Sequence, residues 1–151
     1  MPETLQNFTA TFRSIQPKFS RMFTRILNRA GLTLPQYALL TELGHATRAM
    51  TMTEISRKLY ITKPAVTSLV DRLEKGGYLR RAAHPDDRRI FLLEILAKGR
   101  KTVDCVQGIF LNMLLATLKN FSASDRKIIE KFYAHFSITI DDTLCSKECR
   151  S

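Results

Sequence analysis

The amino-acid sequence predicts a mainly α-helical protein with one small β-hairpin. Apolar residues recur at helical spacing over long stretches near both ends of the chain, and shorter helical patterns with start and stop signals fill its middle. One pair of short apolar segments encloses a turn-rich sequence, which is the pattern of a hairpin. With 151 residues, 44% of them hydrophobic and 25% charged, the chain is long enough to bury a hydrophobic core in one compact unit.

The first long helix is predicted from an apolar pattern with steps of three and four residues, the spacing of a helix that packs along another helix. Its apolar positions are Phe8, Phe12, Ile15, Phe19, Met22 and Ile26. Pro17 lacks a backbone donor, so we expect it to kink this helix or to mark the first turn of its main segment. Gly31 is expected to end the helix as a left-handed cap.

Three shorter helices are predicted in the middle of the chain. Residues 34–43 form the first, with Pro35 in its first turn. The second begins at Thr51 and Glu54, a pair that forms a capping box because each side chain satisfies the other residue's backbone amide. The third opens at Thr62-Lys63-Pro64 and is stopped by Gly76-Gly77.

The hairpin and two further long helices complete the predicted order. Residues 78–81 and 90–93 are the expected strands, and residues 84–87 are the turn-rich tip. The last two helical patterns contain Val103, Val106, Phe110, Met113 and Leu114 in one and Ile129, Phe132, Phe136 and Ile140 in the other. Ser122 is expected to cap the final helix, with Asp125 near its positive end.

The two short helices joined at Tyr60-Ile61 match the helix-turn-helix unit, whose second helix enters the major groove of DNA. Short hydrogen-bonding side chains let such a helix sit deep in the groove, and arginine grips a guanine edge or a phosphate. The alternative is an ordinary amphipathic helix with a solvated polar face. The residues predicted to contact DNA, on this helix and on the hairpin, are Thr62, Lys63, Pro64, Ala65, Thr67, Ser68, Arg72, Arg88 and Arg89.

Basic residues concentrate in and around the hairpin. Arg80, Arg81, Arg88 and Arg89 surround a tip that carries Asp86 and Asp87. Such an arm suits a phosphate backbone or a narrow minor groove, and Asp87 is predicted to support the wing by holding the guanidinium of Arg89. Residues 50–100 contain eleven basic and six acidic residues. Their excess of five positive charges is half of the formal net charge of +10. Charge alone fits a nucleic acid or an anionic membrane equally, and a solvated charged hairpin is the alternative for the arm.

At this point the sequence resembles the MarR family of bacterial and archaeal regulators. The resemblance rests on Met52-Thr53-Glu54-Ile55-Ser56, Thr62-Lys63-Pro64-Ala65-Val66-Thr67, the segment 73–81 (LEKGGYLRR), Asp86-Asp87-Arg88-Arg89 and Leu96-Ala97-Lys98-Gly99. Ala97 stands where the family usually has Thr, which weakens a helix cap. The resemblance implies a winged helix-turn-helix protein that binds a pseudo-palindromic operator as a homodimer, usually as a repressor released by a small ligand or by thiol oxidation.

The predicted domains follow from this arrangement. Residues 1–33 form an N-terminal dimerisation helix, residues 34–96 the DNA-binding domain with its β-hairpin wing, and residues 97–151 the C-terminal dimerisation helices. The chain has neither an apolar run long enough for a membrane span nor the apolar stretch of a signal peptide at its start. We therefore expect a cytoplasmic, nucleoid-associated protein.

A second basic stripe, on the first helix, is a candidate effector site. Lys18, Arg21, Arg25 and Arg29 follow one another at helical spacing, and the last three are predicted to bind a small anionic or aromatic effector. Flanking DNA and a solvated face are the alternatives for this stripe. No cofactor or metal is predicted.

The three cysteines leave a thiol or metal response open. Cys105 lies in an apolar helix and is expected to pack in the core. Cys145 and Cys149 are four residues apart, which suits a thiol switch or half of a metal site, yet two thiols without a nearby histidine are weak ligands.

Two other classes of protein fit the sequence poorly. The three histidines are scattered and no catalytic motif is present, so an enzyme is not expected. A winged-helix module that contacts only protein would show a hydrophobic or acidic outer face on its second helix, and residues 62–72 show neither.

Overall fold

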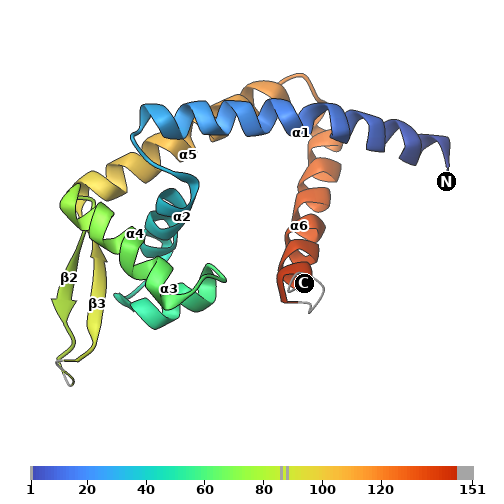
Figure 1. The fold of residues 1–151 in the computed structure, drawn as a ribbon. Helices are drawn as coiled ribbons and strands as arrows, with labels where there is room; N and C mark the ends of the chain where they lie inside the picture. The colour runs from blue at the N-terminus through green and yellow to red at the C-terminus, as the bar shows by residue number, and fades with distance from the viewer. Residues whose placement is uncertain (1, 86, 88, 146–151) are drawn as a thin grey trace. The chain divides into compact units, whose positions relative to one another are not determined.

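The computed structural model describes residues 2–85, 87 and 89–145 and confirms the predicted fold class, mainly α-helical with a small β-hairpin wing (Figure 1). In chain order the elements are α1 (Glu3–Arg29), α2 (Leu34–His45), β1 (Met50–Thr51), α3 (Met52–Lys58), α4 (Lys63–Lys75), β2 (Leu79–Ala83), β3 (Phe91–Ile95), α5 (Ala97–Leu118) and α6 (Ala123–Cys145). The chain divides into two compact units, Met1–Gly108 and Ile109–Ser151. No helix within the described residues is long and apolar enough to cross a membrane.

Local capping signals set the helix boundaries as predicted. Thr51 Oγ1 accepts the backbone N–H of Glu54 at 3.2 Å, and Glu54 Oε2 accepts that of Thr51 at 2.7 Å, so the predicted capping box is confirmed. Gly31 and Gly77 both have φ near +70° and end α1 and α4. Each belongs to a pair of nested backbone hydrogen bonds that satisfies the last carbonyls of its helix.

Pro17 lies inside α1, which begins at Glu3 and runs without a break to Arg29. The interpretation that Pro17 marks the first turn of the main helix is therefore wrong, because four turns of helix precede it. Its missing N–H leaves one carbonyl of the helix without its usual partner.

The sheet has three strands in the order β1-β3-β2, all antiparallel. Leu79 to Ala83 of β2 pair with Ile95 to Phe91 of β3, which confirms the predicted hairpin. Each strand begins one residue later and ends two residues later than predicted. The sequence did not indicate β1, in which Met50 pairs with Leu93. Two residues are too short to show strand alternation, and Thr51 is also the cap of α3, so its capping signal concealed the strand.

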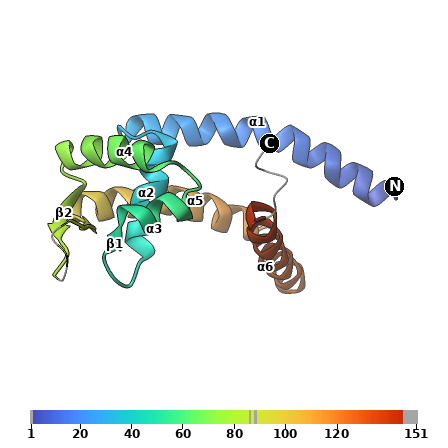
Figure 2. The same ribbon diagram turned by 60° about the horizontal axis from the view of Figure 1, so that its bottom comes forward.

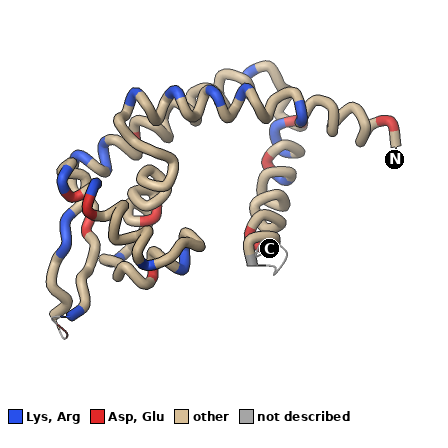
Figure 3. Tube along the Cα trace, in the orientation of Figure 1, with Lys and Arg blue, Asp and Glu red and all other residues tan. Residues whose placement is uncertain are grey.

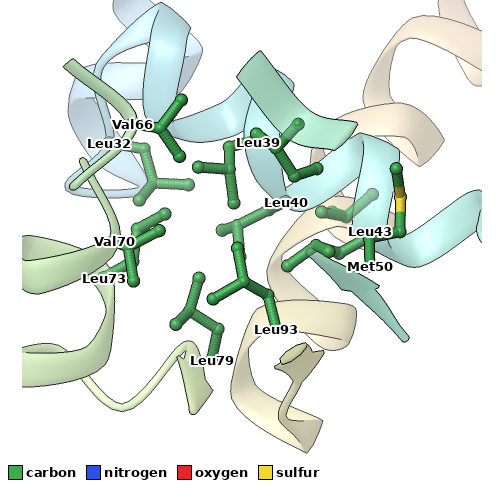
Figure 4. Packing of buried hydrophobic residues seen from close by; sticks show 12 residues of the cluster. Leu32, Leu39, Leu40, Leu43, Met50, Val66, Val70, Leu73, Leu79 and Leu93 are labelled. Carbon is green, nitrogen blue, oxygen red and sulfur yellow. The ribbon is translucent and has the colours of Figure 1, made fainter. Parts of the chain in front are cut away.

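One apolar core lies mainly within the central lobe, which we define as α2 to β3, and also includes Leu32 before α2 and Val103 of α5. Leu39, Leu40 and Ile55 are fully buried, together with Val66 and Val70 of α4. Figure 4 shows side chains of α2, α4 and the strands converging on this core, and Figures 1 and 2 both show α2, α3 and α4 grouped together. The core anchors α4 by one face, and so leaves its other face exposed.

The second unit consists of the later part of α5 and all of α6. Ser122 caps α6 as predicted, because its Oγ accepts the N–H of Asp125 at 3.2 Å. The guanidinium of Arg126 donates to the carbonyls of Leu118 and Lys119, which ties the start of α6 to the end of α5. Cys105, on the part of α5 within the first unit, is exposed. The expectation that it packs in the core is wrong, because the neighbouring Val103 and Val106 occupy the inward face of the helix instead.

Candidate nucleic-acid interface

The turn between α3 and α4 has the tight geometry of a helix-turn-helix. Tyr60 has φ of +53°, a left-handed conformation that is uncommon outside glycine. The N–H of Ile61 donates to the carbonyl of Ser56 at 3.2 Å, and the hydroxyl of Ser56 donates back to the carbonyl of Ile61 at 2.6 Å. These reciprocal bonds hold the turn and set the angle at which α4 leaves it.

The outer face of α4 carries the residues predicted to read DNA. Thr62, Lys63, Pro64, Ala65, Thr67, Ser68 and Arg72 are all exposed, whereas Val66, Val70 and Leu73 are buried. Thr62 is also the N-cap, since its Oγ1 accepts the N–H of Ala65 at 3.4 Å. Among the residues that the structure describes, no acidic group forms an ion pair with Lys63 or Arg72. This face is therefore polar, cationic and accessible.

Two of the wing arginines have acidic partners within the protein. Arg80 Nε donates to Glu94 Oε2 of β3 at 2.7 Å. The guanidinium of Arg81 bridges Asp71 and Glu74, both on α4. The interpretation that all four arginines of the hairpin form one cationic arm therefore fails for these two. Figure 3 shows acidic and basic positions together where α4 meets β2.

The loop of the wing differs from its prediction in one contact. Asp87 was expected to hold the guanidinium of Arg89, whereas its Oδ1 accepts the backbone N–H of that residue at 2.9 Å. The carboxylate thereby shapes the loop, whose N–H at Ile90 also donates to the carbonyl of Asp87. Arg89 is exposed. Arg88, the other predicted contact of the wing, lies outside the described residues.

The start of α3 is held by an ion pair that the sequence did not indicate. Arg48, in the loop before β1, pairs with Glu54 of the capping box. The hydrogen bond from Arg48, together with that from the backbone of Thr51, lowers the pKa of Glu54 to about 2. The carboxylate is thus ionised over the whole neutral range, which stabilises the positive end of α3.

The first turn of α5 packs on the base of the wing. The N–H of Leu96 donates to the carbonyl of Tyr78 at 2.9 Å, and Lys98 Nζ donates to the carbonyl of Gly76 at 2.7 Å. The same ammonium lies 4.3 Å from the centre of the Tyr78 ring. These contacts connect the end of α4, the start of β2 and α5 at one point.

The three predicted effector residues line one groove on α1. Ser20, Thr24 and Asn28 line the same groove, an open depression of about 490 Å³. A neighbouring hollow of about 490 Å³ shares Ser20, Thr24 and Asn28, and half of its lining residues are apolar, among them Phe19, Phe23 and Leu32. Figure 3 shows the basic positions spaced along α1.

The thiols form no metal site in the part of the chain that is described. No group of three His, Cys, Asp or Glu residues there is arranged to hold a metal ion. Cys145 is the last residue of α6, and its side chain and Cys149 lie outside the description.

A helix-turn-helix with an exposed cationic second helix, followed by an antiparallel wing, defines a winged helix-turn-helix DNA-binding protein. Comparisons with known proteins agree. Residues 30–90 match the model of the MarR family. The chain is 28% identical over 132 residues to the HTH-type transcriptional regulator YsmB of Bacillus subtilis. This alignment covers 85% of this chain and 88% of that protein.

Solved structures show the same fold. A MarR family protein from Bacillus stearothermophilus superposes with a TM-score of 0.77 at 25% identity, covering 93% of this chain and 99% of that one. A variant of MepR from S. aureus bound to an oligodeoxyribonucleotide has a TM-score of 0.69 at 21% identity, covering 88% and 97%. In residues 30–90 and in its fold, the chain is therefore similar to the DNA-binding transcriptional regulators of the MarR family.

Proposed function

We propose that this protein is a homodimer that binds a pseudo-palindromic operator as a repressor and is released by a small anionic effector. The observation that carries the proposal is the apolar surface of the helices outside the central lobe. Leu5, Phe8, Phe12, Ile15 and Phe19 of α1 are each about half exposed, at 47% to 54%. Contiguous apolar surface of this kind marks an interaction face in a protein that stays in water.

The second unit carries a larger apolar surface of the same character. None of residues 123–144 of α6 is buried, and the exposed large apolar residues of this helix include Ile128, Phe132, Phe136 and Ile140. Full burial of such a side chain contributes about 1.5–3 kcal/mol, and these side chains are about half exposed, so it takes many of them together to offset the cost of association. Residues 1–33 and 97–151 are accordingly assigned to dimerisation, and residues 34–96 to DNA binding.

Sedimentation at micromolar concentration tests the dimer. The mass should be twice 17.3 kDa. Phe12→Gln should shift the equilibrium toward the monomer, whereas Ser14→Gln, at an exposed polar position of the same helix, should leave it unchanged. A wild-type monomer with an unfolding midpoint independent of concentration contradicts the proposal.

A two-fold dimer requires a two-fold operator. It presents its two copies of α4 to half-sites about 34–36 Å apart, so the operator should be a pseudo-palindrome with that spacing. Selection of bound fragments from the source genome tests this directly. A consensus with a single unpaired site would show that only one lobe reads DNA. Reporter transcription from a promoter that contains the site then separates repression from activation.

The effector is inferred from the two adjoining depressions on α1. Arginine forks suit a carboxylate, and the apolar hollow beside them suits an aromatic ring. By linkage, such a ligand weakens operator binding only if it binds the free dimer more tightly than the DNA-bound one. A gel shift titrated with salicylate-like acids should show release that Arg25→Ala abolishes, whereas Arg13→Ala, an arginine of α1 outside the groove, should not affect it.

Thiol regulation is the second candidate, because Cys105 is exposed on α5. In the same gel shift an oxidant should leave the complex intact if the effector proposal holds. Release by an oxidant that is lost in a protein with all three cysteines changed to serine would assign the switch to the thiols. If neither treatment releases the DNA, the arginine stripe on α1 is a solvated face and not a ligand site.

A further inference from the structure

The wing and α4 are joined by three polar contacts that converge on Arg81 of β2. Its Nη2 lies 2.5 Å from Asp71 Oδ1, and its Nη1 pairs with Glu74 Oε2. Its backbone N–H also donates to Glu74 Oε1 at 2.9 Å. One residue of the wing thus contacts two successive acidic positions of the helix predicted to read DNA.

The geometry makes this contact a rigid one. The planar guanidinium engages both carboxylates at once, which restricts its orientation more than a single ion pair does. β2 is an edge strand, so the outward N–H of Arg81 has no neighbouring strand to pair with, and Glu74 satisfies it instead. Contacts to the edge of the strand and to the side chain together set the angle between β2 and α4.

The electrostatics favour the contact of Arg81 with Asp71 and Glu74. The Arg81 side chain is 22% exposed. This burial lowers the pKa of its guanidinium, but the hydrogen bond to Asp71 and the attraction of Glu74 outweigh it, and the pKa stays above its ordinary value. Asp71 and Glu74 are also the only acidic residues in the α4 sequence. Left unpaired, they would repel the phosphates beside a groove that α4 enters.

The position of Arg81 separates it from the arginine of the loop. Leu79 and Leu93 are buried and anchor the base of the hairpin in the core, while Arg89 lies at its far end. Arg81 is the register partner of Leu93, beyond which the described residues of the hairpin toward the loop are no longer buried. A change in the angle between β2 and α4 moves the loop relative to α4. The loop and α4 can therefore contact DNA together only if that angle is fixed.

We propose that Arg81 is a positioning residue, which holds the wing at a set angle to α4 and neutralises Asp71 and Glu74, without itself contacting DNA. The proposal rests on the proposed assignment of α4 and the wing as the DNA-contacting surfaces. It assigns to one arginine of the hairpin a role opposite to that of Arg89.

The first test compares Arg81→Ala with Arg80→Ala. Both remove one arginine from β2, but Arg80 pairs with Glu94 inside the sheet and does not connect to α4. Operator affinity should fall about tenfold in Arg81→Ala and change less than about twofold in Arg80→Ala, and the loss in Arg81→Ala should persist at high salt, where repulsion by Asp71 and Glu74 is screened. A salt slope lowered by about one would mean that Arg81 contacts a phosphate, and equal affinities of the two variants would mean that the angle is set elsewhere.

The second test releases Arg81 without removing it. Asp71→Asn combined with Glu74→Gln takes two negative charges from α4, so charge alone predicts tighter binding to every DNA. The positioning role predicts instead that affinity for unrelated DNA rises while the ratio of operator to unrelated affinity falls. An unchanged or higher ratio would overturn the proposal.

Two controls separate this inference from the proposed interface. Arg89→Ala should weaken binding in either case, so its failure to do so would refute the interface itself. Amide exchange at residues 80–83 of the DNA-free protein should be faster in Arg81→Ala than in Arg80→Ala if Arg81 holds the wing. If the two variants exchange equally fast, and thermal unfolding shows that both are folded, the positioning role is refuted regardless of their DNA affinities.

Discussion

Replacing Gly99 with alanine tests how closely the first turn of α5 must approach the base of the wing. A Cβ at this position would stand 2.2 Å from the carbonyl oxygen of Tyr78 and 2.9 Å from Cγ1 of Ile95. Ordinary van der Waals contact begins at 3.4 Å, so the helix or the strand must move by more than 1 Å. The same carbonyl accepts the N–H of Leu96, and any such movement also weakens that hydrogen bond.

The expected loss follows from these distances. Overpacking a well-filled site costs about 1–3 kcal/mol, and here the obstacle is backbone, which cannot swing aside as a side chain can. Alanine is favoured over glycine within a helix by up to about 1 kcal/mol, which offsets part of the loss. Gly99→Ala should therefore lower the free energy of unfolding by about 1–2 kcal/mol, or the midpoint by about 2–4 °C for each kcal/mol.

Gly108→Ala is the matched control in the same helix. A Cβ there would meet nothing within 4 Å, so only the helix propensity changes and stability should rise by up to about 1 kcal/mol. Urea unfolding followed by circular dichroism, at one protomer concentration for all proteins, measures both. If Gly99→Ala proves as stable as Gly108→Ala, the close approach of α5 to Tyr78 is refuted.

Three further predictions concern the interface and the caps. Arg89→Ala should weaken binding to operator and to unrelated DNA alike and lower the slope of log affinity against log salt concentration by about one. Fluorescence anisotropy across a salt series measures this slope, and an unchanged slope would mean that Arg89 is only a surface charge. Ser68→Ala should change the preferred base, at a cost of about 1–3 kcal/mol against the wild-type site only, and an identical consensus from a randomised-site selection would exclude Ser68 from the reading face. Because the pKa of Glu54 is lowered to about 2, its stabilising contribution is complete above its ordinary pKa of 4.5 and is lost as the pH falls toward 2. Acid unfolding of Glu54→Gln should accordingly show a shallower loss of stability between those pH values than the wild type, and parallel curves would contradict it.

Helix boundaries and the exposed face of α4 were predicted well because both depend on residues close together in the chain. A capping box needs only Thr51 and Glu54, and Gly77 ends α4 because the chain must there adopt a left-handed turn. The turn at Tyr60-Ile61 was also predicted, but the left-handed conformation of Tyr60 was not, since a tyrosine stands where a glycine would have signalled it.

The wing shows where local reasoning fails. From the sequence its arginines looked alike, since spacing along a strand says nothing about which acidic group lies across from each. The structure pairs Arg80 with Glu94 through the strand register and Arg81 with Asp71 and Glu74 through the packing of α4 against β2, so of the described wing arginines Arg89 remains at the loop. Cys105 was likewise predicted to pack in the core because its helix is apolar, whereas its side chain is exposed.

The sequence by itself determined the class of protein, the order and ends of its main helices and the face of α4 that meets solvent, because periodicity and caps act within a few residues. Tertiary structure alone decided the third strand, the partners of the wing arginines and the reason for Gly99. Those features join residues that lie far apart in the chain, and their distances follow from how the core of the lobe packs rather than from local spacing.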